Sequence, residues 1–170
     1  MNVTVSRRLF ALDDNFPQPV LAAFADALPQ VELVPIRDID PTFAELDDWE
    51  LLRELHRHSR SWDGMITNDD AMLSLSKEMT VLSQTGLTLV VAKGEGHNPI
   101  RAVGVLLCHL AHICHHTKPG TPQIWKLRVT QKNSEPVRDY LETIASKSKT
   151  TVERIIADHK LSANELRRRS

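Results

Sequence analysis

Short apolar runs alternate along the chain with stretches whose apolar residues recur every three or four positions. The apolar runs predict strands at residues 8–12, 31–36, 64–67, 87–92 and 124–129. The stretches with helical spacing predict helices through residues 20–28, 48–55, 72–82 and 100–116. Residues 38–41 and 94–99 are expected to form loops. Because strand and helix signals alternate, we expect an α/β fold with a mainly parallel sheet.

The composition shifts near residue 130. Residues 131–170 are rich in Lys, Arg, Ser and Glu, and they keep helical spacing of apolar residues at 137–144 and 152–156. We therefore expect one domain in residues 1–130, followed by a helical, basic C-terminal extension in residues 131–170. The extension could bind a partner or RNA, or it could be a solvated helix that packs on the edge of the domain.

Charge and cysteine content narrow the function classes. The 170 residues are 41% hydrophobic and 25% charged with a formal net charge of −1, as in a soluble globular protein. That balance argues against tight binding of duplex DNA, but not against transient contact with a short single strand. Cys108 and Cys114 are too far apart on a predicted helix for a disulfide, so we expect a reducing, cytoplasmic setting. The apolar run 102–114 is too short to span a bilayer, and no membrane partner is expected.

Acidic residues follow two of the predicted strands and begin one predicted helix. They are Asp13, Asp14 and Asn15 after the first strand, Asp48 and Glu50 at the helix start, and Thr67, Asn68, Asp69 and Asp70 after the third strand. Each group alone also fits ordinary turn and N-cap chemistry. In an open parallel sheet, however, ligands bind at the carboxyl ends of the strands, so the groups can converge. Converging carboxylates raise one another's pKa, and Mg²⁺ or Mn²⁺ would relieve that repulsion. Phosphodiester hydrolysis is the chemistry that makes most use of such an ion.

The order of these motifs resembles the PIN-like nucleases, and in particular their toxin branch. Members typically open with a strand that ends in an Asp-Glu-Asn-Leu-Pro-like motif, and residues 12–17 here read Leu-Asp-Asp-Asn-Phe-Pro. An Asp-x-Glu-Ile-Leu-like helix start is matched by Asp-Trp-Glu-Leu-Leu at residues 48–52. A Thr-x-Asp-x-Asp-Phe motif is matched by Thr-Asn-Asp-Asp-Ala-Met at residues 67–72. The resemblance covers about residues 8 to 115, and it implies a PIN-like three-layer α/β/α fold.

The same resemblance implies an endoribonuclease that depends on Mg²⁺ or Mn²⁺. It makes Asp13, Asp48 and Asp69 the catalytic carboxylates, with Asp14 and Asp70 as further metal ligands and Asn15, Glu50 and Thr67 in support. Lys93, at a predicted strand end, is a candidate contact to the RNA substrate. Family members are often toxins that a cognate antitoxin neutralises, and they often form homodimers. Two positions depart from the pattern: Ala71 replaces the second Asp of the last motif, so Asp70 would have to substitute, and Asp14 replaces a Glu.

Two other classes remain open. A phosphoacceptor receiver domain also carries paired acids after its first strand, and in that interpretation Asp69 would accept the phosphoryl group and Lys93 would be its lysine. A receiver also needs a later strand that ends in Thr or Ser before the lysine strand, and it would leave Asp48 and Glu50 without a role. The third possibility is a catalytically inactive PIN-like module that binds partners through its basic tail.

Histidines gather on the predicted helix 100–116. His112 and His116 are one turn apart, which is a usable spacing for zinc ligands. On a helical wheel, however, His109, His112 and His116 lie opposite the apolar side. We therefore expect a solvated face there. The preceding loop, 94–99, lacks the Lys-Ser/Thr pair of a phosphate-binding loop.

Overall fold

The computed structural model describes residues 7–16, 27–92, 98–127 and 134–167. Within these residues, six strands form one sheet in the order β2-β1-β3-β4-β5-β6. They are β1 (Arg8–Leu12), β2 (Val31–Pro35), β3 (Gly64–Thr67), β4 (Thr88–Val91), β5 (Gln123–Lys126) and β6 (Glu135–Pro136). The first five strands are parallel, and β6 is antiparallel to β5. The predicted α/β class with a mainly parallel sheet is confirmed.

Helices connect the strands and continue beyond them. They are α2 (Ile36–Ile39), the 3-10 helix η2 (Pro41–Glu45), α3 (Asp48–Arg57), the 3-10 helix η3 (Ala71–Ser74), α4 (Ser76–Gln84), α5 (Pro99–His116), α6 (Val137–Lys147), α7 (Val152–His159) and α8 (Ala163–Leu166). The helix predicted for residues 20–28 lies mostly outside the described residues, as do most of the loop predicted at 94–99 and Lys93.

The prediction of a loop at residues 38–41 was wrong, because α2 and η2 meet there. Asp40 begins η2 by accepting a hydrogen bond from the Thr42 amide (2.9 Å), and Pro41 suits the first helical turn. Ile36 and Phe43 are buried, so this short segment is held against the core by its apolar side chains.

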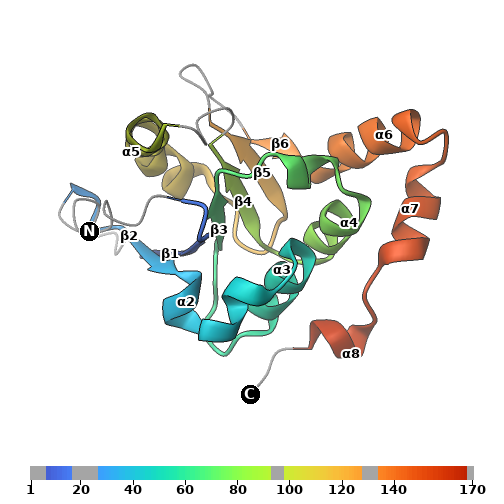
Figure 1. Cartoon of the computed structure of the whole chain (residues 1–170), viewed down its shortest axis with the longest axis horizontal. Helices are drawn as coiled ribbons and strands as arrows, with labels where there is room; N and C mark the ends of the chain where they lie inside the picture. Colours follow the sequence, from blue (N-terminus) through green and yellow to red (C-terminus); the bar gives the residue numbers. More distant parts are fainter. Residues whose placement is uncertain (1–6, 17–26, 93–97, 128–133, 168–170) are drawn as a thin grey trace, which may run out of the picture.

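Alternate residues of the strands face opposite sides of the sheet and form two separate apolar layers. Leu9 and Ala11 of β1 belong to the layer that also contains residues of α3, α4, α6 and α7. Phe10 and Leu12 belong to the layer that contains residues of α5. Figure 1 shows α5 on one side of the sheet and α3, α4, α6 and α7 on the other. The fold is therefore a three-layer α/β/α sandwich, and because both faces are covered, the central positions of β1, β3, β4 and β5 are apolar.

The strand order places a topological switch point at the carboxyl ends of β1 and β3. The chain passes from β1 to β2 on one side, and it then returns to β3 on the other side of β1. The connections after β1 and β3 therefore diverge, and such a switch point is where open α/β sheets bind ligands. Past the end of β1, the Asp13 amide still donates a hydrogen bond to the Ile66 carbonyl (3.0 Å), so Asp13 is held beside β3.

The described part of the expected C-terminal extension adds β6 to the sheet edge and places helices on the core. Pro136 can occupy β6 because an edge strand does not need every amide as a donor. The buried side chains of α6 and α7 lie in the same apolar layer as those of α3 and α4; they are Val137, Leu141, Ile144, Ala145, Val152 and Ile155. The predicted domain boundary near residue 130 falls in residues 128–133, outside the described residues, and stays a prediction.

Helix α5 is amphipathic, as its histidine pattern predicts. Of the three histidines predicted for a solvated face, His112 and His116 are exposed and His109 is half-buried, whereas Leu110 and Ile113 are buried against the sheet. Both cysteines of α5 are free thiols. Among the described residues, no helix combines the length and the apolar character needed to cross a membrane.

Candidate functional site

One hydroxyl group links the carboxyl ends of β1 and β3. Thr67 Oγ1 donates a hydrogen bond to Asp13 Oδ2 (2.7 Å), and Thr67 Oγ1 also accepts a hydrogen bond from the Asp69 amide (3.0 Å). Asp13 is only 7% exposed and Thr67 only 1%. The structure thus brings together three of the residues predicted for the site, and Thr67 lies between the two acidic motifs.

The two loops that follow β1 and β3 also hold each other. Asn15 Nδ2 donates to Asp13 Oδ2 (3.4 Å), and Asn68 Nδ2 donates to the Asn15 carbonyl (3.2 Å). On the β3 side, Asp69 Oδ1 accepts a hydrogen bond from the Ala71 amide (2.8 Å), which closes a tight turn. These bonds hold the two loops together at the carboxyl ends of β1 and β3.

Asp48 is the third acidic residue predicted for the site, and it begins α3. The helix start is fixed by Asp47 and Glu50, since the Asp47 amide donates to Glu50 Oε2 (3.2 Å) in a capping box. Glu50 therefore caps α3, whereas Asp48, the first residue of the helix, is partly buried. The local helix-start chemistry positions Asp48 without using its carboxylate.

The pKa shifts indicate that these carboxylates interact electrostatically. Burial, followed by the charges of Asp13, Asp69, Glu78 and Asp47, raises the pKa of Asp48 to about 6. Burial also raises the pKa of Asp13, although hydrogen bonds from Thr67, the Asp14 amide and Asn15 oppose the shift. Asp48 is thus close enough to feel charges that lie far away in the sequence, on the loops after β1 and β3.

Glu78 is a further carboxylate of this cluster, and the sequence analysis missed it. It lies in the first turn of α4, is 8% exposed, and its charge contributes to the raised pKa of Asp48. Its spacing from the apolar residues Met79 and Leu82 places it on the buried side of the helix, and a glutamate at such a position is the signal that could have revealed it.

Asp14 and Asp70 occupy different surroundings from the three central aspartates. Asp14 forms an ion pair with the exposed guanidinium of Arg37 in α2, a partner that sequence analysis did not anticipate. Asp70 precedes η3 and lines a neighbouring cleft. The methyl group of Ala71 stands where the related motif has a second carboxylate, so this turn offers one fewer oxygen ligand.

The carboxylates of this cluster are chemically suited to a hard divalent cation, but they lie too far apart to hold one as they stand. Asp13, Asp48, Asp69 and Glu78 offer only carboxylate oxygens, the ligands that Mg²⁺ and Mn²⁺ prefer. A cation would also relieve the repulsion that raises the pKa of Asp48. Across the described ranges, no three His, Cys, Asp or Glu side chains stand close enough together to hold an ion as they are placed. Binding would therefore require these carboxylates to move closer together.

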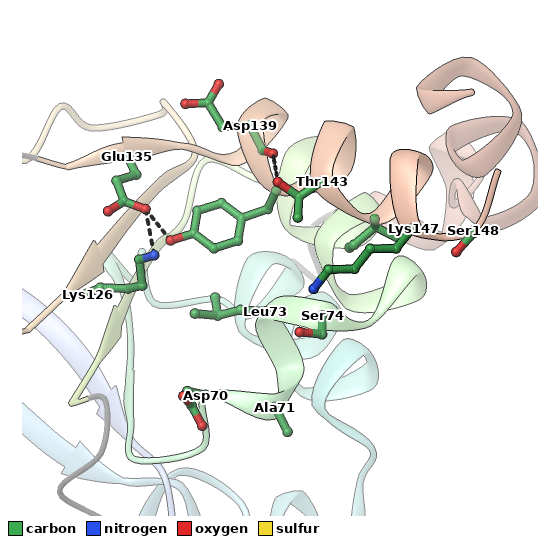
Figure 2. Close-up of a pocket in the computed structure, with 12 residues that line it drawn as sticks. Asp70, Ala71, Leu73, Ser74, Lys126, Glu135, Asp139, Thr143, Lys147 and Ser148 are labelled. Atoms are coloured by element: carbon green, nitrogen blue, oxygen red, sulfur yellow. Dashed lines mark hydrogen bonds and ion pairs between the residues drawn. The ribbon is translucent and has the colours of Figure 1, made fainter. Parts of the chain in front are cut away.

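A cleft of about 520 Å³ begins beside the acidic residues, at Asp70 and Ala71. Figure 2 shows these two residues at one end of the cleft, with η3 on one side and α6 on the other. Its lining is mostly polar and comes from η3, the end of β5, β6 and α6; the residues besides Asp70 and Ala71 are Leu73, Ser74, Lys126, Glu135, Asp139, Tyr140, Thr143, Ile144, Lys147 and Ser148. Helix α6 therefore borders the cleft that begins at Asp70 and Ala71.

Comparison of the chain with protein-family models, with curated proteins and with solved structures found no match, so its function is argued from its own residues.

Proposed function

We propose that this protein is a ribonuclease that hydrolyses phosphodiester bonds with the help of Mg²⁺ or Mn²⁺. The observation that carries the proposal is the hydrogen bonding of Thr67 to Asp13 and to the Asp69 amide at the switch point between β1 and β3, with Asp48 near enough for the charges of both aspartates to raise its pKa. Buried, mutually repelling carboxylates are costly for a fold, and a site that binds a cation explains why they are placed together.

Each residue has a defined part in this proposal. Asp13, Asp48 and Asp69 would hold the cation, which when bound supplies positive charge to phosphoryl oxygens and lowers the pKa of water. Thr67 is a positioning residue, because its hydroxyl orients Asp13 and restrains the backbone at Asp69. Glu78 adds negative charge behind Asp48 and so strengthens the attraction for a cation.

The choice of RNA as substrate rests on the resemblance of three motifs to the PIN-like nucleases. The same resemblance extends the proposal to a toxin with a cognate antitoxin and to a homodimer. The free thiols of Cys108 and Cys114 agree with work in a reducing, cytoplasmic compartment. A near-neutral net charge of −1 suits brief contact with single strands better than firm binding of duplexes.

A receiver-like phosphoacceptor is the second candidate, and the strand order favours it. Five parallel strands in the order β2-β1-β3-β4-β5 are also the arrangement of such signalling domains. Against it, Lys93 follows β4 after Ala92, and among the described residues no strand lies between β3 and β4 to supply the expected strand-end hydroxyl. Asp48 would also repel a phosphoryl group on Asp69. Labelling with a small phosphoryl donor such as acetyl phosphate separates the two, because only a receiver becomes covalently labelled.

The proposed activity is tested by cleavage of single-stranded RNA with Mn²⁺. We expect Asp69→Asn to lower the rate at least a hundredfold, because the substitution keeps the shape of the side chain and removes one anionic ligand. The matched control is Asp158→Asn, on an exposed i,i+4 ion pair with Arg154 in α7. Cleavage by the Asp69→Asn protein at the wild-type rate would reject the assignment.

A further inference from the structure

The cleft beside the acidic residues has walls from two distant parts of the chain. One wall is η3, which follows Asp69 directly, and the other is α6 in the C-terminal segment. Its volume of about 520 Å³ lies within the range of small-ligand sites. Anything bound at the acidic site that extends toward η3 therefore enters a space bordered by α6.

Lys147 supplies an available positive charge to this cleft. Figure 2 shows its side chain extending from α6 across the cleft toward Ser74 of η3, with Ser148 beside it. Within the ranges that the structure describes, Lys147 has no ion-pair partner. An ammonium group beside a hydroxyl group is a combination that proteins use to contact phosphate.

The part of the cleft formed by β5, β6 and the start of α6 is polar, and its side chains are held by contacts with one another. Lys126 Nζ forms an ion pair with Glu135 Oε2 (3.1 Å), and the Tyr140 hydroxyl donates a hydrogen bond to the same oxygen. Lys126 also lies 4.9 Å from the centre of the Tyr140 ring. These contacts neutralise Lys126 and hold Tyr140, which also packs against the apolar layer of α4 and α6, as a fixed wall of the cleft. Asp139 adds a carboxylate that can accept a hydrogen bond from a ribose hydroxyl.

We infer that this cleft holds the nucleotide adjacent to the bond that is cut, with Lys147 contacting its phosphate and Asp139 accepting a hydrogen bond from its ribose. The inference rests on the proposed ribonuclease function and assigns to α6 the task of binding the single strand. This assignment explains how a chain without excess positive charge can hold RNA. Lys147, which has no ion-pair partner among the described residues, faces the RNA where the RNA leaves the acidic site.

The test is binding of a fluorescent single-stranded oligoribonucleotide, followed by anisotropy with Ca²⁺ in place of Mn²⁺, together with steady-state cleavage. We expect Lys147→Gln to weaken binding about three- to tenfold and to reduce the slope of log K against log salt by about 0.7, the value for one lost phosphate contact on a single strand. Lys147→Glu should weaken binding further. In cleavage, KM should rise while kcat is retained. The matched control is Lys118→Gln, an exposed lysine that follows α5 at the opposite edge of the sheet.

The outcomes separate this inference from the proposed function. If the wild type cleaves RNA but Lys147→Gln binds and cleaves like Lys118→Gln, the cleft assignment is overturned and the ribonuclease proposal stands. If binding depends on Lys147 but no cleavage occurs, the cleft assignment stands and the proposed hydrolysis fails. A wild type that does not bind the oligoribonucleotide overturns the cleft assignment.

Discussion

The hydroxyl of Thr67 donates a 2.7 Å hydrogen bond to the buried carboxylate of Asp13, and it joins two strands that are neighbours only because the chain returns past β1. The bond opposes the rise in the pKa of Asp13 that burial causes. Thr67 also accepts a hydrogen bond from the Asp69 amide. The Thr67 side chain therefore links the carboxylate of Asp13 to the backbone at Asp69.

Replacing Thr67 with valine keeps the shape of the side chain and removes this bond. We expect Thr67→Val to lower the free energy of unfolding by about 1–3 kcal/mol at pH 7.5, because a buried carboxylate loses a donor. The matched control is Thr88→Val in β4, whose Oγ1 is buried and has no hydrogen-bond partner in the described part of the chain. Urea denaturation of both variants makes the comparison. Equal effects of the two substitutions would contradict the role given to Thr67.

The raised pKa of Asp48 predicts a stability that falls as the pH rises. Below about pH 4 the carboxyl is protonated in both the folded and the unfolded chain, so it contributes nothing. Between about pH 4 and pH 6 the unfolded chain releases the proton while the folded chain keeps it, and the folded state loses stability. Asp48→Asn should therefore raise the free energy of unfolding by about 1–2 kcal/mol at pH 7.5, a value reduced for partial solvent exposure.

Urea denaturation in EDTA, at pH 4 and at pH 7.5, checks this prediction. The increase in the free energy of unfolding caused by Asp48→Asn should be absent at pH 4 and present at pH 7.5. A benefit of the same size at both pH values would show that the charge of Asp48 is not the cause.

Asp63 offers a test of stability that is separate from the site. At the amino ends of the strands, its carboxylate accepts hydrogen bonds from Arg8 (2.8 Å) and from the Leu9 amide (2.8 Å). Arg8 also donates to the Cys114 and Thr117 carbonyls, so this contact ties α5 to the sheet. Asp63→Asn should lower the free energy of unfolding by about 1.5–3 kcal/mol and leave Mn²⁺ affinity unchanged. Impaired Mn²⁺ binding by the folded variant would mean that the amino ends of the strands, where Asp63 lies, are coupled to the acidic site at the carboxyl ends.

Local patterns predicted most of the fold because they reflect local physics. Apolar runs buried on both faces became strands, and the cap at Asp47 began α3 where an acidic cap was expected. The neighbourhood of Asp13 and Asp69 was predictable for the same reason, since parallel strands expose their carboxyl ends at one edge.

What sequence reasoning missed depends on tertiary packing. Local periodicity does not encode that β1 lies between β2 and β3, and nothing near Asp14 indicates that Arg37 will pair with it. Glu78 joins the acidic residues only because α4 turns that face inward, and α6 borders the cleft because its apolar side packs on α4. These relationships arise from the way helices are placed on the sheet.

Manganese binding measured by calorimetry on the wild type and on Asp13→Asn tests the central claim most directly. The substituted side chain can still accept the Thr67 hydrogen bond, so the variant should remain folded while it loses one buried charge. We predict that the wild type binds Mn²⁺, that Asp13→Asn binds it at least about tenfold more weakly, and that Asp158→Asn binds it like the wild type. Equal affinity of wild type and Asp13→Asn, or a folded wild type that does not bind Mn²⁺, would contradict the account and leave the acidic motifs as turns and helix caps.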